Sequence, residues 1–284
     1  MPIANIRGVN IIYKVLGKGG PWVALSPGGR RDMSAVEGLA TLIADQGFRV
    51  LIHDRRNCGL SDICIEGEDS EYEIWADDLY ELLRQREALP AYIGGSSSGC
   101  RLSVLFALRH PEAVKGLLLW RVTGGRFACE RLAFNYYQQY IDAAETGGMR
   151  AVTQLDHFKE RCEANPSNLG YLLRLDPKRF IAVMQHWREY FLRGADLPII
   201  GASEADLRSI KVPAVVIPGN DRTHGTETGK TAARLIPKAE LRTIWPKDLD
   251  IDLSPHEDWD VKNGEMAGYF VDMMRRVESA SAKA

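Results

Sequence analysis

The sequence contains no long hydrophobic run. No apolar stretch approaches the roughly 18 residues that a membrane-spanning helix requires. The N-terminus alternates between apolar and polar residues like a strand, and it lacks the charged and then apolar segments of a signal peptide. We therefore expect no membrane span and no secretory leader, and we expect a cytoplasmic protein.

An excess of charge of one sign is also absent. The chain has 36 Lys and Arg against 38 Asp and Glu, interspersed, for a formal net charge of −2. A nucleic acid or an anionic membrane needs a basic surface, and no basic block is present. The composition favours a small, partly apolar molecule as the partner and leaves self-association open.

Cysteine is scarce and shows no pairing pattern. The five cysteines are scattered, without CxxC or Cys/His spacing, which favours reduced thiols over disulfides. No group of His, Cys, Asp and Glu has the spacing of metal ligands. We therefore expect neither a metal nor another cofactor.

The most informative stretch that is present runs from Ala91 to Ala107. A short apolar run, Ala91–Ile93, predicts a buried strand; small residues follow, and then a helical pattern. Within the turn, Gly95-x-Ser97-x-Gly99 has the spacing of a nucleophile elbow, in which a serine sits on a sharp, strained turn. Of three consecutive serines, only Ser97 has glycine two residues away on both sides.

This turn predicts chemistry at Ser97. A helix beginning directly after the serine points its free N–H groups at the reacting atom, so the Ser98 N–H could stabilise an oxyanion. The alternative is a glycine-serine turn without chemistry. The strand–turn–helix context favours a catalytic Ser97.

The rest of the chain alternates strands and helices. Residues 3–6 and 9–15 predict an antiparallel hairpin. The later strands read as near-continuous apolar runs, which is typical of a parallel sheet covered by helices on both faces. We expect them at residues 22–25, 48–52, 91–93, 114–120, 212–217 and 240–245.

Between residues 122 and 209 this alternation stops. The stretch is helical in pattern and rich in aromatic residues, which predicts an inserted helical cap. We therefore expect a core domain formed by residues 1–121 and 210–284, and a cap formed by residues 122–209.

The order of elements and three loop motifs resemble the α/β-hydrolase superfamily, in its capped esterase and epoxide-hydrolase-like branch. Gly95–Gly99 matches the nucleophile elbow, Ser26–Gly29 lies where the family has its oxyanion loop, and Asp54–Asp62 resembles its D-x-R-x-x-G-x-S-D loop. The resemblance implies a mostly parallel eight-stranded sheet with helices on both faces and an inserted helical cap.

The resemblance also implies a catalytic triad in the chain order serine, acid, histidine. Ser97, Asp221 and His256 satisfy it, with an oxyanion hole formed by Gly29 and Ser98. His224 is the competing base. It lies only three residues after Asp221, which departs from the usual topology, so the sequence favours His256, the only histidine after the last predicted strand.

Further residues are expected around the substrate. Trp120, Arg121 and Arg126 follow the strand before the cap and are expected to face the cavity, where an arginine could pair with a substrate carboxylate or form a salt bridge within the cap. The expected substrate-binding residues are Gly28, Arg30, Trp120, Arg121, Tyr137 and Trp187.

Together these features predict a serine hydrolase that cleaves a carboxylic ester, lactone or related acyl compound through an acyl-enzyme. One alternative is hydrolysis of a carbon–carbon bond in a diketone-like substrate, suggested by His256-x-x-Trp259 and by the arginines that face the cap. Another is a slow-turnover ligand-binding receptor, because fold does not fix function.

Overall fold

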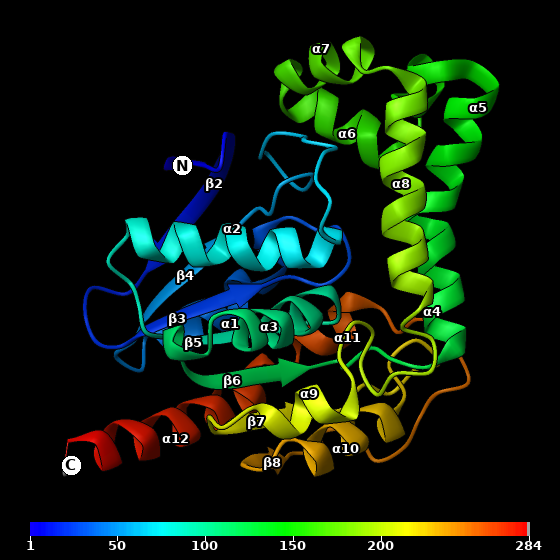
Figure 1. Cartoon of the computed structure of the whole chain (residues 1–284). Coiled ribbons are helices and arrows are strands. Elements are labelled where there is room, and N and C mark those ends of the chain that lie inside the picture. The colour runs from blue at the N-terminus through cyan, green and yellow to red at the C-terminus, as the bar shows by residue number, and fades with distance from the viewer. Residues whose placement is uncertain (283–284) are drawn as a thin grey trace.

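The computed structural model describes residues 1–282 and is built around one eight-stranded sheet (Figure 1). The strand order is β1-β2-β4-β3-β5-β6-β7-β8, antiparallel from β1 to β4 and parallel from there on. The strands are β1 (Ile3–Ile6), β2 (Val9–Leu16), β3 (Trp22–Ser26), β4 (Arg49–His53), β5 (Ala91–Ser96), β6 (Val114–Trp120), β7 (Ala214–Ile217) and β8 (Ala239–Leu241).

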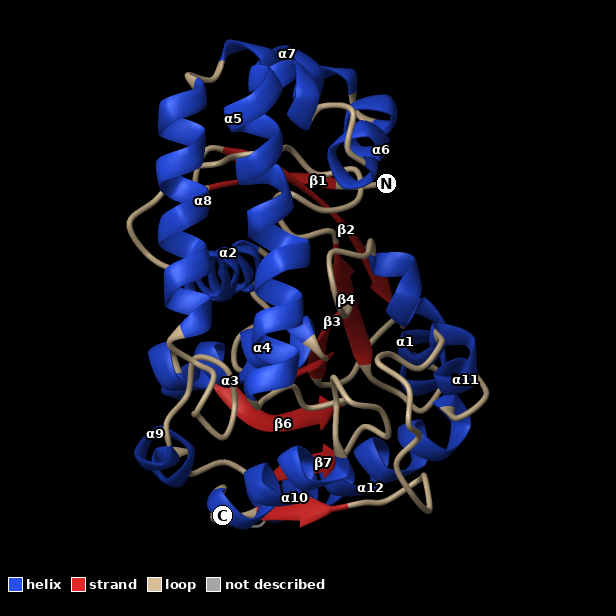
Figure 2. Ribbon diagram, turned by 90° about the vertical axis from the view of Figure 1, so that its right-hand side faces the viewer, coloured by secondary structure: helices blue, strands red, loops and turns tan. Residues whose placement is uncertain are grey.

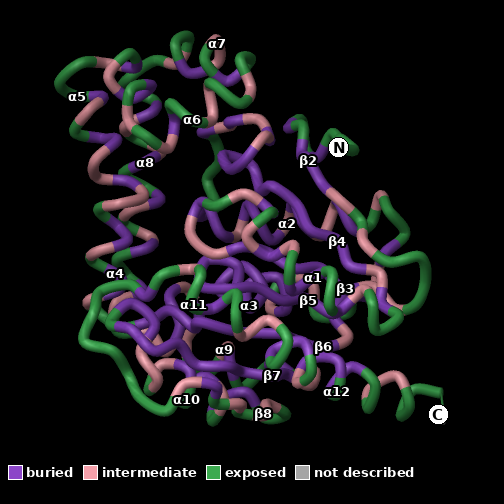
Figure 3. The backbone as a smooth tube through the Cα atoms, turned by 180° about the vertical axis from the view of Figure 1, so that it is seen from behind, coloured by how far each residue is buried: buried purple, intermediate pink, exposed green. Residues whose placement is uncertain are grey.

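Helices cover both faces of the sheet (Figure 2). On one face lie α1 (Glu37–Ala44), which continues the 3-10 turn η1 (Met33–Val36), and α12 (Asn263–Ser281). On the other lie α2 (Glu71–Gln85), α3 (Ser98–Arg109), which is followed by the 3-10 turn η2 (Pro111–Ala113), α9 (Glu204–Ser209) and α10 (Thr226–Leu235). Because both faces are covered, the central strands are buried, as Figure 3 shows.

A group of helices is inserted between β6 and β7. In Figure 1 the long helices α5 and α8 stand side by side away from the sheet, with α6 and α7 at their far end. The insertion comprises α4 (Arg126–Ala133), a π-helical turn η3 (Phe134–Gln138), α5 (Gln139–Val152), α6 (Asp156–Ala164), α7 (Pro166–Arg174) and α8 (Pro177–Leu192). The predicted fold class is confirmed, whereas its division into core and cap domains stays a prediction.

The predicted hairpin of the first two strands forms. Ser70 and Glu73 form a reciprocal capping box that starts α2. The last strand is wrong in extent: β8 ends at Leu241, which is exposed at the edge of the sheet, and the chain then enters a long loop. After this loop the chain forms two further helices, α11 (His256–Asp260) and α12.

Within residues 1–282, every helix is too short or too polar to cross a bilayer.

Candidate active site

Ser97 lies in a strained turn between β5 and α3. Its backbone has φ 52° and ψ −108°, a conformation that residues other than glycine rarely adopt. The two glycines of the motif are required for close packing. A Cβ at Gly95 would lie 2.4 Å from the carbonyl carbon of Gly99, and one at Gly99 would lie 2.1 Å from the Ser26 oxygen. The turn therefore fixes Ser97 at the N-terminus of α3.

Ser97 is hydrogen-bonded to a histidine and, through it, to a carboxylate. The distance from Ser97 Oγ to His224 Nε2 is 2.8 Å, and the distance from His224 Nδ1 to Asp221 Oδ1 is 2.9 Å. A carboxylate only accepts, so Nδ1–H donates to Asp221 and Nε2 is left to accept from Ser97. This is the order nucleophile, base and orienting acid.

The loop after β7 brings His224 back onto its own acid. Asp221 Oδ1 accepts the backbone N–H groups of Thr223 and His224 at 3.0 and 2.8 Å, which closes a tight turn. Gly219 leaves space for the His224 side chain, because a Cβ at residue 219 would lie 2.2 Å from His224 Cβ. Three residues of separation are therefore enough to place acid and base in contact.

His256 does not occupy the position expected for it. His256 Nε2 lies 2.9 Å from the Ala35 carbonyl oxygen and donates a hydrogen bond to it, so it is not bonded to Ser97. The expectation that His256 lies between Ser97 and Asp221 is wrong in geometry. It assumed that only a loop after the last strand could reach Ser97, whereas the turn at Gly219 delivers His224 from the preceding loop.

The second oxygen of Asp221 is held by the long loop after β8 and by the end of β6. Asp221 Oδ2 accepts from Ser254 N at 2.9 Å, from Ser254 Oγ at 2.7 Å and from an Arg121 nitrogen at 3.2 Å. Trp259 Nε1 donates to Ser254 Oγ at 3.1 Å. The loop expected to carry the base instead supports the acid.

These contacts determine how the pair titrates. Burial lowers the pKa of His224 to about 4; the hydrogen bond to Asp221 opposes this, and the Arg121 charge reinforces it. Burial raises the pKa of Asp221, but hydrogen bonds from His224 and Ser254 outweigh it and hold that pKa below its ordinary value. At neutral pH the imidazole is neutral and able to accept a proton.

The expected oxyanion residues lie beside Ser97. A Cβ at Gly28 would lie 3.3 Å from Ser97 Cβ, and Gly29 adopts φ 54°. Ser98 is the first residue of α3, so its N–H is not used by the helix. Its hydroxyl faces elsewhere and accepts from Arg101 at 3.0 Å.

A cavity of about 90 Å³ opens beside Ser97 and His224. Its wall includes Gly28, Gly29 and Arg121 of the expected set. The wall is completed by Arg31, Ser96, Leu132, Tyr136, Thr223, Leu253, Ser254 and His256.

Four other residues expected to bind substrate lie outside this wall. Arg30 is buried in an ion pair with Glu71 at 2.7 Å, and Tyr137 donates to the same carboxylate at 3.0 Å. Trp120 packs on the face of the sheet that α1 and α12 cover, against Phe270 of α12. The fourth, Trp187, is buried and donates through Nε1 to a backbone carbonyl at Asp69.

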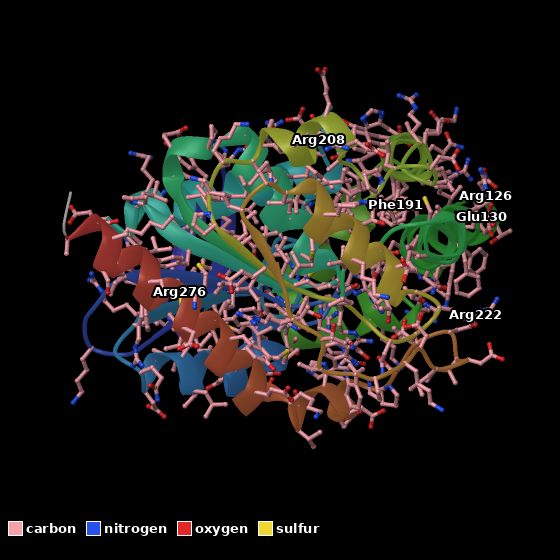
Figure 4. The ribbon with its side chains drawn as sticks, turned by 90° about the horizontal axis from the view of Figure 1, so that it is seen from below. Arg126, Glu130, Phe191, Arg208, Arg222 and Arg276 are labelled. Carbon is pink, nitrogen blue, oxygen red and sulfur yellow. The ribbon has the colours of Figure 1, made fainter. Side chains whose placement is uncertain are left out.

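Arg126, at the start of α4, projects from the edge of the molecule beside Glu130, as Figure 4 shows. It pairs with Asp196 at 2.9 Å and does not line the cavity. Within residues 1–282 no group of three or more His, Cys, Asp or Glu is placed to hold a metal ion.

Three residues at the site carried no signal in the sequence. Ser254 and Thr123 are single hydroxyl residues in loops, and Thr123 Oγ1 lies 3.2 Å from Ser97 Oγ. Tyr136 is one of many aromatic residues in the insertion, and its hydroxyl lies 3.6 Å from the Cβ position of Gly29. For His224 a signal existed, namely its position in the polar loop that contains Asp221.

Comparisons with known proteins agree with the fold described above. Residues 21–172 match a family model described as alpha/beta hydrolase fold. An uncharacterised hydrolase of Bacillus subtilis (strain 168), YraK, is 35% identical over 110 residues, which are 39% of this chain and 40% of that protein. The non-heme chloroperoxidase CPO-A1 of Kitasatospora aureofaciens is 26% identical over 90% of this chain and 94% of its own.

Among solved structures, a thermophilic esterase from Thermogutta terrifontis aligns with a TM-score of 0.66. It is 18% identical, and the alignment covers 98% of this chain and 99% of that one. At this identity the likeness shows the fold.

Proposed function

Because the chain belongs to the α/β-hydrolase family and is an enzyme of that type, we propose that it is a serine hydrolase that cleaves a carboxylic ester, lactone or related acyl compound. The observation that carries the proposal is the continuous hydrogen-bonded path from Ser97 Oγ through His224 to Asp221. The esterase activity of the similar Thermogutta terrifontis protein is consistent with it.

The reaction proceeds in two halves. Ser97 Oγ attacks the acyl carbon while His224 Nε2 takes the hydroxyl proton, and Asp221 stabilises the imidazolium that forms. We assign the N–H groups of Ser98 and Gly29 to stabilise the developing oxyanion. The protonated His224 then gives its proton to the leaving alcohol. Water, activated by the same histidine, releases the acid from the acyl-enzyme.

The features that suggested carbon–carbon bond hydrolysis have other roles in the structure. Trp259 donates to Ser254, which supports Asp221, and the Arg121 guanidinium lies 5.2 Å from the centre of the Trp259 ring. Both residues therefore also serve to hold the loop that carries Ser254. Ester hydrolysis therefore stays the proposal, and the receptor alternative is separated from it by turnover.

The test combines labelling with turnover. A fluorophosphonate is expected to label the wild-type protein at Ser97, and short-chain 4-nitrophenyl esters are expected to give turnover with an acyl burst. Ser97→Ala removes the attacking atom and fits the turn, so it should abolish both, while Ser96→Ala should retain activity. Labelling without turnover would favour the other two readings, and normal turnover by Ser97→Ala would exclude the proposal.

A further inference from the structure

The permanent charges on the wall of the cavity are positive. They are the guanidinium groups of Arg31 and Arg121, and among the described residues no carboxylate belongs to the wall. Asp221 lies behind it, where its two oxygens are occupied by the donors described above. A substrate entering the cavity therefore meets cationic groups and neutral ones.

Arg31 is the charge that is free to act on a ligand. It is exposed and lies next to the glycines of the oxyanion loop, and within residues 1–282 its guanidinium forms no hydrogen bond and no ion pair. The preceding residue shows the contrast. Arg30 is buried, held by Glu71 and packed against the Tyr136 ring, so it is a structural cation.

A second unsatisfied donor lies nearby on the same wall. Arg121 is 6% exposed, and its Nε has no hydrogen-bond partner among the described residues. Burial lowers the pKa of Arg121 and the neighbouring charge of Arg31 lowers it further, although Asp221 opposes both. Two guanidinium groups that repel each other gain from an anion placed beside them.

The acids around this wall do not supply that anion. Asp252 pairs with Arg222 at 2.9 Å, and Asp32 accepts the N–H of Ser34 at 2.8 Å. Asp258 contributes to the electrostatics of Arg121, but it is exposed and outside the wall. Arg121 is itself paired with Asp221 at 3.2 Å, so Arg31 is the cation on the wall that has no ion-pair partner among residues 1–282.

We propose that the site is specific for short-chain esters or lactones that carry a carboxylate, and that Arg31 binds this carboxylate. The inference rests on the proposed function, because it assigns a substrate class to the same site. The cavity is small, about 90 Å³, which suits a compact substrate.

The first test measures binding without turnover. Monomethyl succinate carries an ester and a carboxylate, and methyl succinamate replaces the carboxylate by a neutral amide of the same shape. In the Ser97→Ala protein, calorimetry should find the carboxylate bound about tenfold more tightly or better, as one charge-assisted contact allows. Adding Arg31→Gln should remove this difference. Equal affinities for the two esters in Ser97→Ala would overturn the proposal.

The second test uses the wild-type enzyme and locates the carboxylate. A second pair of esters, acetylglycolate and its neutral amide acetylglycolamide, differs in charge on the leaving alcohol. The succinate pair differs in charge on the acyl group. The proposal predicts that kcat/KM is about tenfold higher for the charged member of one of the pairs. In Arg31→Gln this preference should be lost, and the KM of the charged ester should rise. Arg126→Gln removes an exposed guanidinium outside the cavity and serves as the control.

The outcomes separate the two proposals. Serine-dependent hydrolysis of the neutral esters with no preference for the charged ones would leave the proposed function standing and exclude a role for Arg31. A preference that survives Arg31→Gln would exclude Arg31 as the binding group. Tight binding of the carboxylate without hydrolysis of any ester would retain the site and overturn the serine hydrolase.

Discussion

Arg121 and Asp221 together set the pH at which His224 can accept a proton. Only the neutral imidazole can act as the base, so activity is present above the pKa of His224 and lost below it. Because burial and the Arg121 charge lower this pKa to about 4, we expect the acid limb of kcat/KM near pH 4. An unperturbed histidine would place it near 6.5. A pH–rate profile on a neutral ester measures this directly.

Removing the positive charge should move that limb. Arg121→Gln takes a cation away from the imidazole, which favours the protonated form, so the acid limb should shift to higher pH. Arg126→Gln, far from the imidazole, should leave the limb where it is. A shift to lower pH in Arg121→Gln would contradict the role assigned to that charge.

The identity of Ser97 as the serine of the strained turn could be predicted because its two glycines are local signals. The base could not be chosen in the same way. The distance between His224 and Ser97 depends on a turn made by Gly219, three backbone N–H groups that donate to Asp221, and a long loop that ends at Ser254. Spacing along the chain does not report such a contact.

At the scale of elements, the loop after β7 depends on one glycine. Gly219→Ala places a Cβ 2.1 Å from the His224 carbonyl oxygen and 2.2 Å from its Cβ, so the histidine must move. We expect kcat to fall by about a hundredfold, since displacement by about 1 Å costs this much. Gly225→Ala is the matched control in the same loop, where the nearest atom lies 3.9 Å away.

Steady-state kinetics on both variants, with circular dichroism to verify folding, checks this expectation. Equal activity of Gly219→Ala and the wild-type protein would show that the tight turn is not needed to place the base.

Strands and helices were predictable where apolar periodicity decides them. Val114–Trp120 is buried throughout, and β6 has those bounds. The edge of the sheet was not predictable in the same way. Beyond Leu241 the apolar residues Ile244 and Trp245 continue the pattern, yet they pack against the α12 side of the core from a loop, so tertiary packing ended the strand.

At the scale of the whole molecule, a buried ion pair joins the inserted helices to the sheet. Arg30 follows β3, Glu71 opens α2, and the pair binds the π-helical turn through the Tyr137 hydroxyl and the Tyr136 carbonyl. Glu71→Ala leaves a buried guanidinium without its partner, which typically costs about 3–5 kcal/mol of unfolding free energy.

The double variant Arg30→Met/Glu71→Leu removes both charges and should recover most of that loss. Urea unfolding of the wild-type protein, the single variant and the double variant measures all three free energies. A double variant no more stable than Glu71→Ala would mean that the pair matters for its contacts to the inserted helices and not for its charges.

The fold class was predictable from the alternation of apolar strands and helices, because each parallel strand must be covered on both faces. The path of the inserted helices over the site was not, since it depends on contacts between residues far apart in the chain. Arg30 is an example. Its position beside the oxyanion loop predicted a contact with the substrate, but in the structure it is buried and forms an ion pair with Glu71.

The most direct test of the account compares His224→Ala with His256→Ala in one esterase assay, with circular dichroism to confirm that both are folded. His224 contacts Ser97 and Asp221, whereas His256 contacts the Ala35 carbonyl. Loss of a triad member typically costs roughly four orders of magnitude or more in turnover. We expect such a loss for His224→Ala and about tenfold or less for His256→Ala. A larger loss for His256→Ala than for His224→Ala would contradict the site described.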